Sequence, residues 1–196
     1  MTARAITRAD ILDPAEYERR RAGLRARNVE RKKARRVHVG PFATFHFENR
    51  ETMWVQIQEM LRIEKGGEAQ IEGELEAYNP LVPKGRELIA TLMLEIEDAQ
   101  HRAVVLQRLG GVENTVTLGF AGDTVRALPV HPDEERTTPE GKTSSVHFLR
   151  FRFTDAQVAK FRGPQTQVVL GFAHPNYQHA AAVPETVRLA LAGDFD

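Results

Sequence analysis

The spacing of apolar residues changes most clearly near Glu87. Before that point most apolar residues recur three or four positions apart, as on one face of a helix. After it they alternate, most clearly in 146–153, as in a strand with one face in the core and one in water. Helices that precede a run of strands predict an α+β fold rather than repeated βαβ units. We therefore expect N-terminal helices followed by a mainly antiparallel sheet, sandwich- or barrel-like, with short peripheral helices.

Local signals place the ends of the expected elements. Asp13 and Pro14 have the residue types of a helix cap and a first helical position, and Gly66 follows a helical pattern. The pair Gly40-Pro41 interrupts an alternating strand pattern. The expected helices span 14–35, 50–65, 68–77, 98–109, 155–161 and 184–192. The expected strands span 37–47, 88–96, 115–120, 125–130, 146–153 and 166–172, and 131–143 is predicted to be a mobile loop.

Positive charge is concentrated near the N-terminus. Ten of the eighteen residues from Arg19 to Arg36 are Arg or Lys, whereas the whole chain carries 27 basic and 27 acidic side chains. The rest of the chain therefore has an excess of about nine negative charges. We predict a basic helical arm over 1–36 and a single α+β domain over 37–196, with a helical part at 49–77 and a strand-rich part at 87–196.

The basic arm limits the partners that the chain can accept. We expect the arm to dock on an acidic surface, either of the same chain or of a neighbouring subunit. Docking on a neighbouring subunit would make the protein a homo-oligomer. Binding of nucleic acid through the arm is a second alternative to the leading function below. It is less favoured because the arm has no interleaved aromatic residues on which bases could stack.

The absence of cysteine excludes several chemistries. With no cysteine the chain cannot form disulfides, thiolate zinc sites, its own iron–sulfur ligation or a cysteine nucleophile. No apolar run approaches the roughly 20 residues that a membrane-spanning helix needs. The first thirteen residues have no apolar core of a secretory signal. We therefore expect a cytoplasmic protein without a membrane span.

A dense group of polar residues accompanies the predicted second helix. On that helix Thr52, Gln56 and Glu59 share a face, and converging oxygen atoms can hold a cation or orient a polar ligand. An ordinary polar helix face with a Glu59–Arg62 pair is the alternative. The candidate ligand- or partner-binding residues are Glu48, Asn49, Arg50, Gln56, Glu59, Arg62, Tyr78 and Asn79.

The signals for catalysis and for metal binding are weaker. The chain has no Gly-x-Ser-x-Gly turn, no phosphate-binding loop and no paired Glu-x-x-His motif, so no cofactor and no resident iron or zinc are expected. An enzyme or metal-binding protein with a site around Glu48–Glu59, including His46, remains the alternative function. A further alternative is a mononuclear metal site formed by four histidines: His131, His147, His174 and His179.

Several segments together resemble one known family. They are 35–40, 47–50 with the polar residues of the following helix, 74–81 and 149–151. The chain resembles, over nearly its whole length, an uncharacterised bacterial family, the domain of unknown function 3501. Genes of that family often stand beside genes for rubrerythrin-like proteins and iron–sulfur oxidoreductases. The resemblance thus implies an accessory or binding protein of a redox system, with such a protein as partner, and it implies no catalytic residues.

Overall fold

The computed structural model describes residues 4–196. In chain order its helices are η1 (Arg8–Asp10), α1 (Pro14–Lys33), α2 (Arg50–Glu64), α3 (Glu68–Tyr78), η2 (Asn79–Leu81), α4 (Ala99–Gln107), η3 (Val112–Thr115), α5 (Asp155–Arg162) and α6 (Glu185–Ala192). Its strands are β1 (Arg36–Val39), β2 (Ala43–Glu48), β3 (Glu87–Leu94), β4 (Val116–Phe120), β5 (Asp123–Pro129), β6 (Val146–Arg152), β7 (Val168–Phe172) and β8 (Ala180–Ala182). Among these residues no helix combines the length and the apolar content that crossing a bilayer requires.

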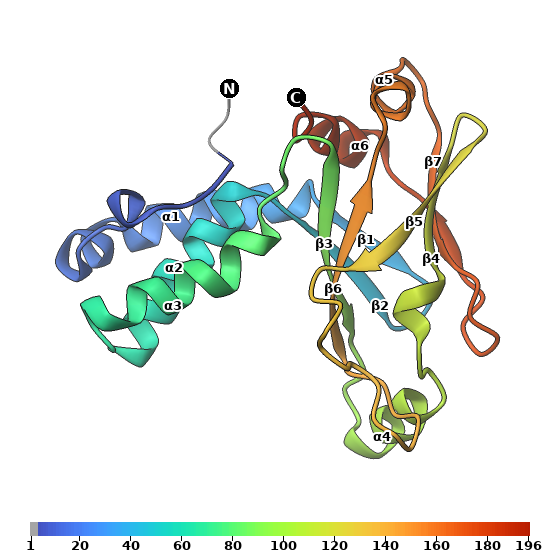
Figure 1. The fold of residues 1–196 in the computed structure, drawn as a ribbon, viewed down its shortest axis with the longest axis horizontal. Helices are drawn as coiled ribbons and strands as arrows, with labels where there is room; N and C mark the ends of the chain where they lie inside the picture. The colour runs from blue at the N-terminus through green and yellow to red at the C-terminus, as the bar shows by residue number, and fades with distance from the viewer. Residues whose placement is uncertain (1–3) are drawn as a thin grey trace.

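The strands form one antiparallel sheet that is nearly closed (Figure 1). Its order is β1-β2-β3-β6-β5-β4-β7-β8, and the two edge strands, β1 and β8, lie against each other. The expectation of an α+β fold with N-terminal helices and a mainly antiparallel, barrel-like sheet is confirmed.

The barrel interior is filled by alternate side chains of the strands. Phe45 and Phe47 of β2 point inward and are 0% and 1% exposed, and Leu92 of β3 faces Phe45 across the register. One end is closed by an aromatic cluster in which Phe161 of α5 packs edge-on against Phe153 and Phe195. The barrel therefore holds a packed core rather than a channel.

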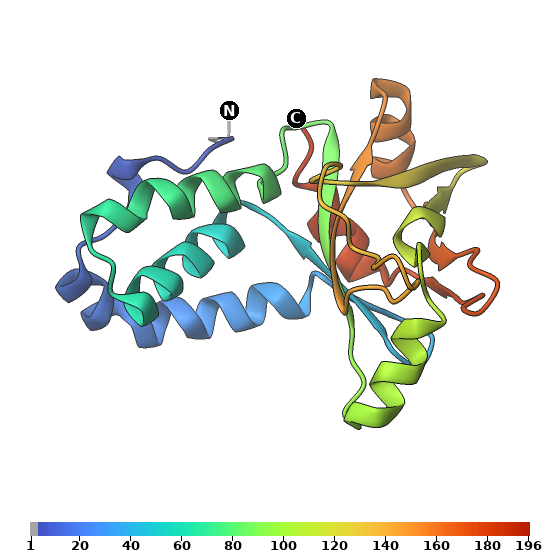
Figure 2. The same cartoon turned by 60° about the horizontal axis from the view of Figure 1, so that its bottom comes forward.

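The helices η1, α1, α2 and α3 form a separate layer beside the barrel, which we call the helical lobe (Figures 1 and 2). A second hydrophobic cluster joins this lobe to the outer face of the sheet, where Ile57 and Ile71 of the lobe belong to the same cluster as Ile89 of β3. The chain enters the barrel from α1 through β1 and leaves it from β2 into α2. The turn from β2 to α2 is consequently a junction between the two layers.

Most predicted boundaries agree with the structure to within about two residues. Asp13 caps α1, accepting hydrogen bonds from the backbone N–H groups of Ala15 and Glu16, each at 3.0 Å. The expected strand 37–47 is a hairpin, since Gly40 turns the chain with a φ of +67°. The strand β8 escaped prediction because its three residues are alanines, which carry little strand propensity.

Candidate functional site

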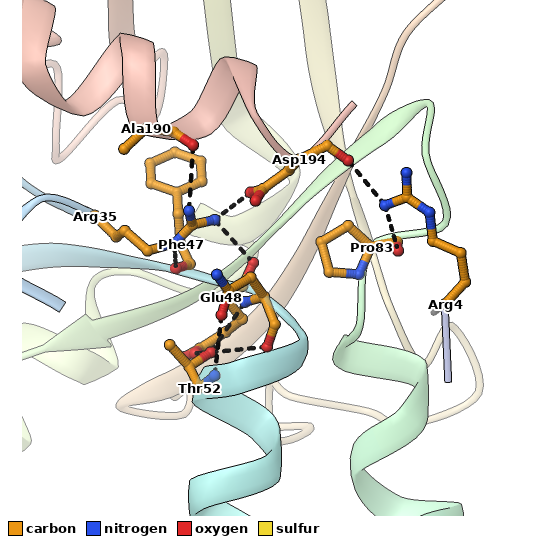
Figure 3. A network of polar contacts seen from close by, with 9 residues as sticks. Arg4, Arg35, Phe47, Glu48, Thr52, Pro83, Ala190 and Asp194 are labelled. Atoms are coloured by element: carbon orange, nitrogen blue, oxygen red, sulfur yellow. Dashed lines mark hydrogen bonds and ion pairs between the residues drawn. The ribbon is translucent and has the colours of Figure 1, made fainter. Parts of the chain in front are cut away.

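The first residues of the polar group form a compact corner where β2 meets α2 (Figure 3). Glu48 is 4% exposed, and its two carboxylate oxygens accept hydrogen bonds from the hydroxyls of Thr52, at 2.6 Å, and Thr91, at 2.8 Å. Asn49 caps α2: its Oδ1 accepts from the Thr52 N–H, and its own N–H donates to the Thr52 hydroxyl, both at 2.9 Å. Asn49 and Thr52 therefore satisfy each other's polar groups at the first turn of α2, as a capping box does.

Arg50 turns away from this corner toward the N-terminal segment. Its guanidinium pairs with Asp10 at 2.7 Å and donates to the Ala5 carbonyl at 3.1 Å. A hydrogen bond from the Thr7 N–H, together with Arg50, lowers the pKa of Asp10. Glu48 and Arg50 therefore bind different groups on different sides of the turn.

We expect the Asn49→Ala substitution to lower the free energy of unfolding by about 1 kcal/mol, because it removes the side-chain cap of α2. Asn49→Asp retains an oxygen acceptor and is the matched control, with a change below about 0.5 kcal/mol. Urea unfolding of both variants provides the measurement. Equal losses of stability in the two variants would contradict a role for the cap.

A second network beside this corner ties the C-terminus to β2 (Figure 3). Arg35 is 4% exposed, donates to the Phe47 carbonyl at 2.9 Å and to the Glu48 carbonyl, and pairs with Asp194. A cleft of about 350 Å³ opens here, but its arginines are largely engaged, since Arg4 pairs with Asp196 as Arg35 does with Asp194. The network is therefore mainly a structural link.

The middle of α2 makes its polar contacts with α1. Glu59 accepts hydrogen bonds from the Tyr17 hydroxyl at 2.6 Å and from two nitrogens of Arg21 at 2.8 Å. The bonds from Arg21, followed by that from Tyr17, lower the pKa of Glu59 to about 2. Burial, followed by the bond to Glu59, raises the pKa of Tyr17. Glu59 is thus a firmly ionised anchor between the two helices.

The Glu59–Arg62 pair of the alternative interpretation does not form within α2. Arg62 pairs instead with Glu18 of α1 at 2.7 Å, while Glu59 pairs with Arg21. The reason is the packing of α1 alongside α2, which brings opposite charges together across the two helices. The α1 side chains that make these pairs, Glu18 and Arg21, both belong to the segment predicted as a basic arm.

The remaining predicted residues do not gather at one point. Thr52 and Glu59 are seven positions apart on α2, a rise of about 10 Å, and Gln56 between them is half-buried. Tyr78 packs into the hydrophobic cluster of the helical lobe. The Asn79 side chain holds the backbone of Ile6, accepting from its N–H at 2.7 Å and donating to its carbonyl at 2.9 Å.

A cavity of about 650 Å³ lies in the helical lobe, between the segment 8–18 and the α2–α3 hairpin. Apolar side chains that include Ile11, Leu61 and Ile71 line it. Gln58 also borders it; this residue is 2% exposed and its Nε2 has no hydrogen-bond partner in the described chain. Because a buried amide without a partner is costly, a group that satisfies Gln58 would be stabilised here.

Charged residues surround the mouth of this cavity. Two exposed ion pairs, Arg8–Glu68 at 2.5 Å and Glu18–Arg62 at 2.7 Å, connect the N-terminal segment with α3 and α2. Lys65, which ends α2 with a φ of 55°, also lines the cavity. The helical lobe therefore combines an apolar wall, one buried amide and a polar rim, the usual composition of a small-molecule site.

The comparisons with known proteins agree with the resemblance found in the sequence. The family model described as "Protein of unknown function (DUF3501)" matches residues 5–195. The chain belongs to this family. A crystal structure of a novel protein of unknown function from Burkholderia pseudomallei K96243 is 38% identical, has a TM-score of 0.88, and is matched over 98% of this chain and 100% of that one. No curated protein matches this member of the family.

The cavity of this DUF3501 member was not foreseen from the sequence. Gln58 stands two positions from Gln56 and has the same residue type, so only its burial distinguishes it. The opposite wall comes from residues more than 40 positions earlier, such as Ile11 and Ala15. Of the binding residues predicted from the sequence, only Arg62 lines this cavity.

The histidines separate into distinct environments. His131 and His147 border one small cavity, whereas His174 contacts the Gly110 carbonyl through Nε2 at 3.2 Å and His179 packs against a tyrosine ring. His46 is half-buried, and its burial lowers its pKa. The four histidines considered from the sequence therefore do not meet in one place.

Proposed function

We propose that this protein is a binding protein that holds a small organic molecule in the cavity of the helical lobe. The observation that carries the proposal is Gln58, a buried amide without a partner on the wall of an otherwise largely apolar cavity. The volume of about 650 Å³ lies within the range of about 300–1,000 Å³ that is usual for ligand sites.

The lining indicates the chemistry of the ligand. Ile11, Leu61 and Ile71 suit an apolar body, and the Nε2 of Gln58 requires an oxygen that accepts a hydrogen bond. Lys65 at the rim has no ion pair among residues 4–196, which favours a ligand with a negative head group. We therefore expect an amphipathic molecule with a carboxylate, sulfonate or carbonyl group.

A binding role is favoured over the enzyme alternative. The carboxylate of Glu48 is engaged by two hydroxyls, and that of Glu59 is engaged by Tyr17 and Arg21. With a pKa of about 2, Glu59 is also far too weak a base to abstract a proton near neutral pH. The accessory role beside an iron–sulfur oxidoreductase or a rubrerythrin-like partner is part of the proposal and rests on the family resemblance alone.

Binding of 1-anilinonaphthalene-8-sulfonate, an apolar fluorophore with an anionic head, tests the proposal. We expect one saturable site on the folded protein and a loss of at least about tenfold in affinity in Ala15→Trp, whose indole would occupy the cavity. Ala26→Trp places the same side chain on an exposed part of α1 that does not line the cavity, and it should bind like the wild type. Equal binding by the two variants would reject the site.

Gln58→Met provides a separate prediction on stability. The substitution keeps the volume of the side chain but removes the unpartnered amide, so we expect the free energy of unfolding to rise by about 1 kcal/mol. The affinity for the fluorophore should fall at the same time, because the ligand loses its buried donor. Gln56→Met, at a half-buried position outside the cavity, is the control and should leave the affinity unchanged. Lower stability in Gln58→Met would show that the amide is satisfied in the free protein.

A further inference from the structure

A second, much smaller cavity lies between η3 and the start of β6. Its volume is about 30 Å³, which is room for one water molecule or one ion. His147 of β6 is 1% exposed and Glu113 of η3 is 8% exposed, and both line it. Neither residue belongs to the cavity of the helical lobe.

The hydrogen bonds of His147 fix which of its nitrogens faces Glu113. Its Nε2 lies 2.9 Å from the Ser144 carbonyl and 3.1 Å from the Thr143 hydroxyl. Because the carbonyl can only accept, we assign the proton of the neutral ring to this nitrogen. Its Nδ1 then presents a lone pair toward the Glu113 Oε2 at 3.8 Å. Burial, the largest cause, lowers the pKa of His147, against the opposite effect of the Glu113 carboxylate.

Two buried acceptor atoms consequently face each other without a donor. Neither His147 Nδ1 nor Glu113 Oε2 has a hydrogen-bond partner in the described chain. Their separation of 3.8 Å is too long for a shared proton. It is close to the distance of about 3.4 Å that separates two ligands of a tetrahedral zinc ion with bonds of about 2.0–2.1 Å.

We propose that Glu113 and His147 are the inner half of a site for one divalent transition-metal ion of the zinc class. Imidazole nitrogen and carboxylate oxygen are ligands that such ions accept. The bond from Nε2 to a backbone carbonyl is the arrangement that usually orients a metal-binding histidine. The proposed metal site is separate from the cavity of the helical lobe, and it departs from the expectation, drawn from the missing Glu-x-x-His pair, that no zinc is resident.

The outer half of the site comes from the loop before β6. Among residues 4–196 no three His, Asp or Glu side chains are yet close enough to surround an ion, but His131 and Glu134 line the same cavity. Arg136 also lines it, paired with Glu134 and lying 5.3 Å over the Phe148 ring, so its charge partly opposes a cation. The two negative charges of Glu113 and Glu134 exceed the single positive charge of Arg136. A shift of the loop before β6 would bring His131 or Glu134 close enough to be the third ligand.

Equilibrium dialysis of the untagged, full-length protein against Zn²⁺ tests the proposal, and the spectrum of added Co²⁺ reports the geometry of the ligands. We expect one equivalent to bind and the affinity to fall at least tenfold in both Glu113→Gln and His131→Ala. His101→Ala, an exposed histidine on α4, is the control for unspecific binding and should bind like the wild type.

Because Glu113 is buried, circular dichroism must show that Glu113→Gln is folded, and His131→Ala, at a half-buried position, gives an independent readout. The absence of a saturable equivalent in the wild type would overturn the metal site. The same conclusion would follow if His101→Ala lost the metal and His131→Ala retained it.

Discussion

Replacing Arg35 by methionine is expected to lower the free energy of unfolding by about 3–5 kcal/mol. The side chains of Arg35 and Asp194 are only 5% and 10% exposed, and the substitution leaves the Asp194 carboxylate buried without its counter-charge. Burial already raises the pKa of Asp194, and this effect is larger than the opposite effect of the Arg35 guanidinium. The substitution also removes the donor to the Phe47 and Glu48 carbonyls. Urea unfolding monitored by circular dichroism provides the measurement.

Two further variants show whether the effect arises from the unpaired charge. Arg35→Met combined with Asp194→Leu removes both charges, and we expect this double variant to recover a large part of the lost stability. Arg36→Met changes the neighbouring, exposed arginine and should alter the free energy of unfolding by less than about 0.5 kcal/mol. A double variant as unstable as Arg35→Met alone would mean that lost packing, rather than the buried charge, causes the effect.

The sequence predicted the secondary structure well because its signals are local. Spacing of apolar residues and capping residues such as Asp13 and Asn49 act within one or two turns, and the structure uses both caps. Closure of the barrel is different, since it pairs β3 with β6, which are more than 50 positions apart, and brings β1 against β8. No local pattern encodes such pairings, so the sequence could only suggest a sandwich or a barrel.

The same limit applies to the candidate sites. The corner at Glu48 and Asn49 could be predicted because its residues are neighbours in the sequence. The partner of Glu59, in contrast, is Arg21, 38 positions away, whereas the sequence offered only the nearer Arg62 as an alternative partner. Likewise, nothing in the sequence marks Gln58 as buried or places His147 opposite Glu113. A site formed by residues from both the helical lobe and the barrel, or from distant helices, can be identified only from the packed structure.

The contact of Glu59 with Tyr17 and Arg21 should make the stability of the protein depend on pH in acid. The pKa of Glu59 is lowered from an ordinary value of 4.5 to about 2 in the folded protein. A carboxylate whose pKa is depressed by folding contributes stability above its unfolded pKa, and this contribution is lost as the pH falls through the folded value. The stabilisation from Glu59 is therefore complete above about pH 5 and declines between pH 5 and pH 2.

The expected size of this loss is about 2 kcal/mol. The pKa difference corresponds to an upper bound of about 3 kcal/mol, which we reduce because the Glu59 side chain is 19% exposed and partly screened by solvent. In Glu59→Gln the stability at pH 7 should be lower, and the difference from the wild type should shrink as the pH falls toward 2. Urea unfolding at a series of pH values measures both curves.

Glu68→Gln is the control for this experiment. Its partner Arg8 also lowers the pKa of Glu68, but the pair is exposed, so its removal should change the pH dependence far less than removal of Glu59. Parallel curves for the wild type and Glu59→Gln would contradict the anchor between α1 and α2. A converging pair of curves would instead show that this ionised carboxylate holds α1 in the helical lobe, where Tyr17 lines the proposed ligand cavity. Binding of the fluorophore should then weaken in acid together with the loss of stability.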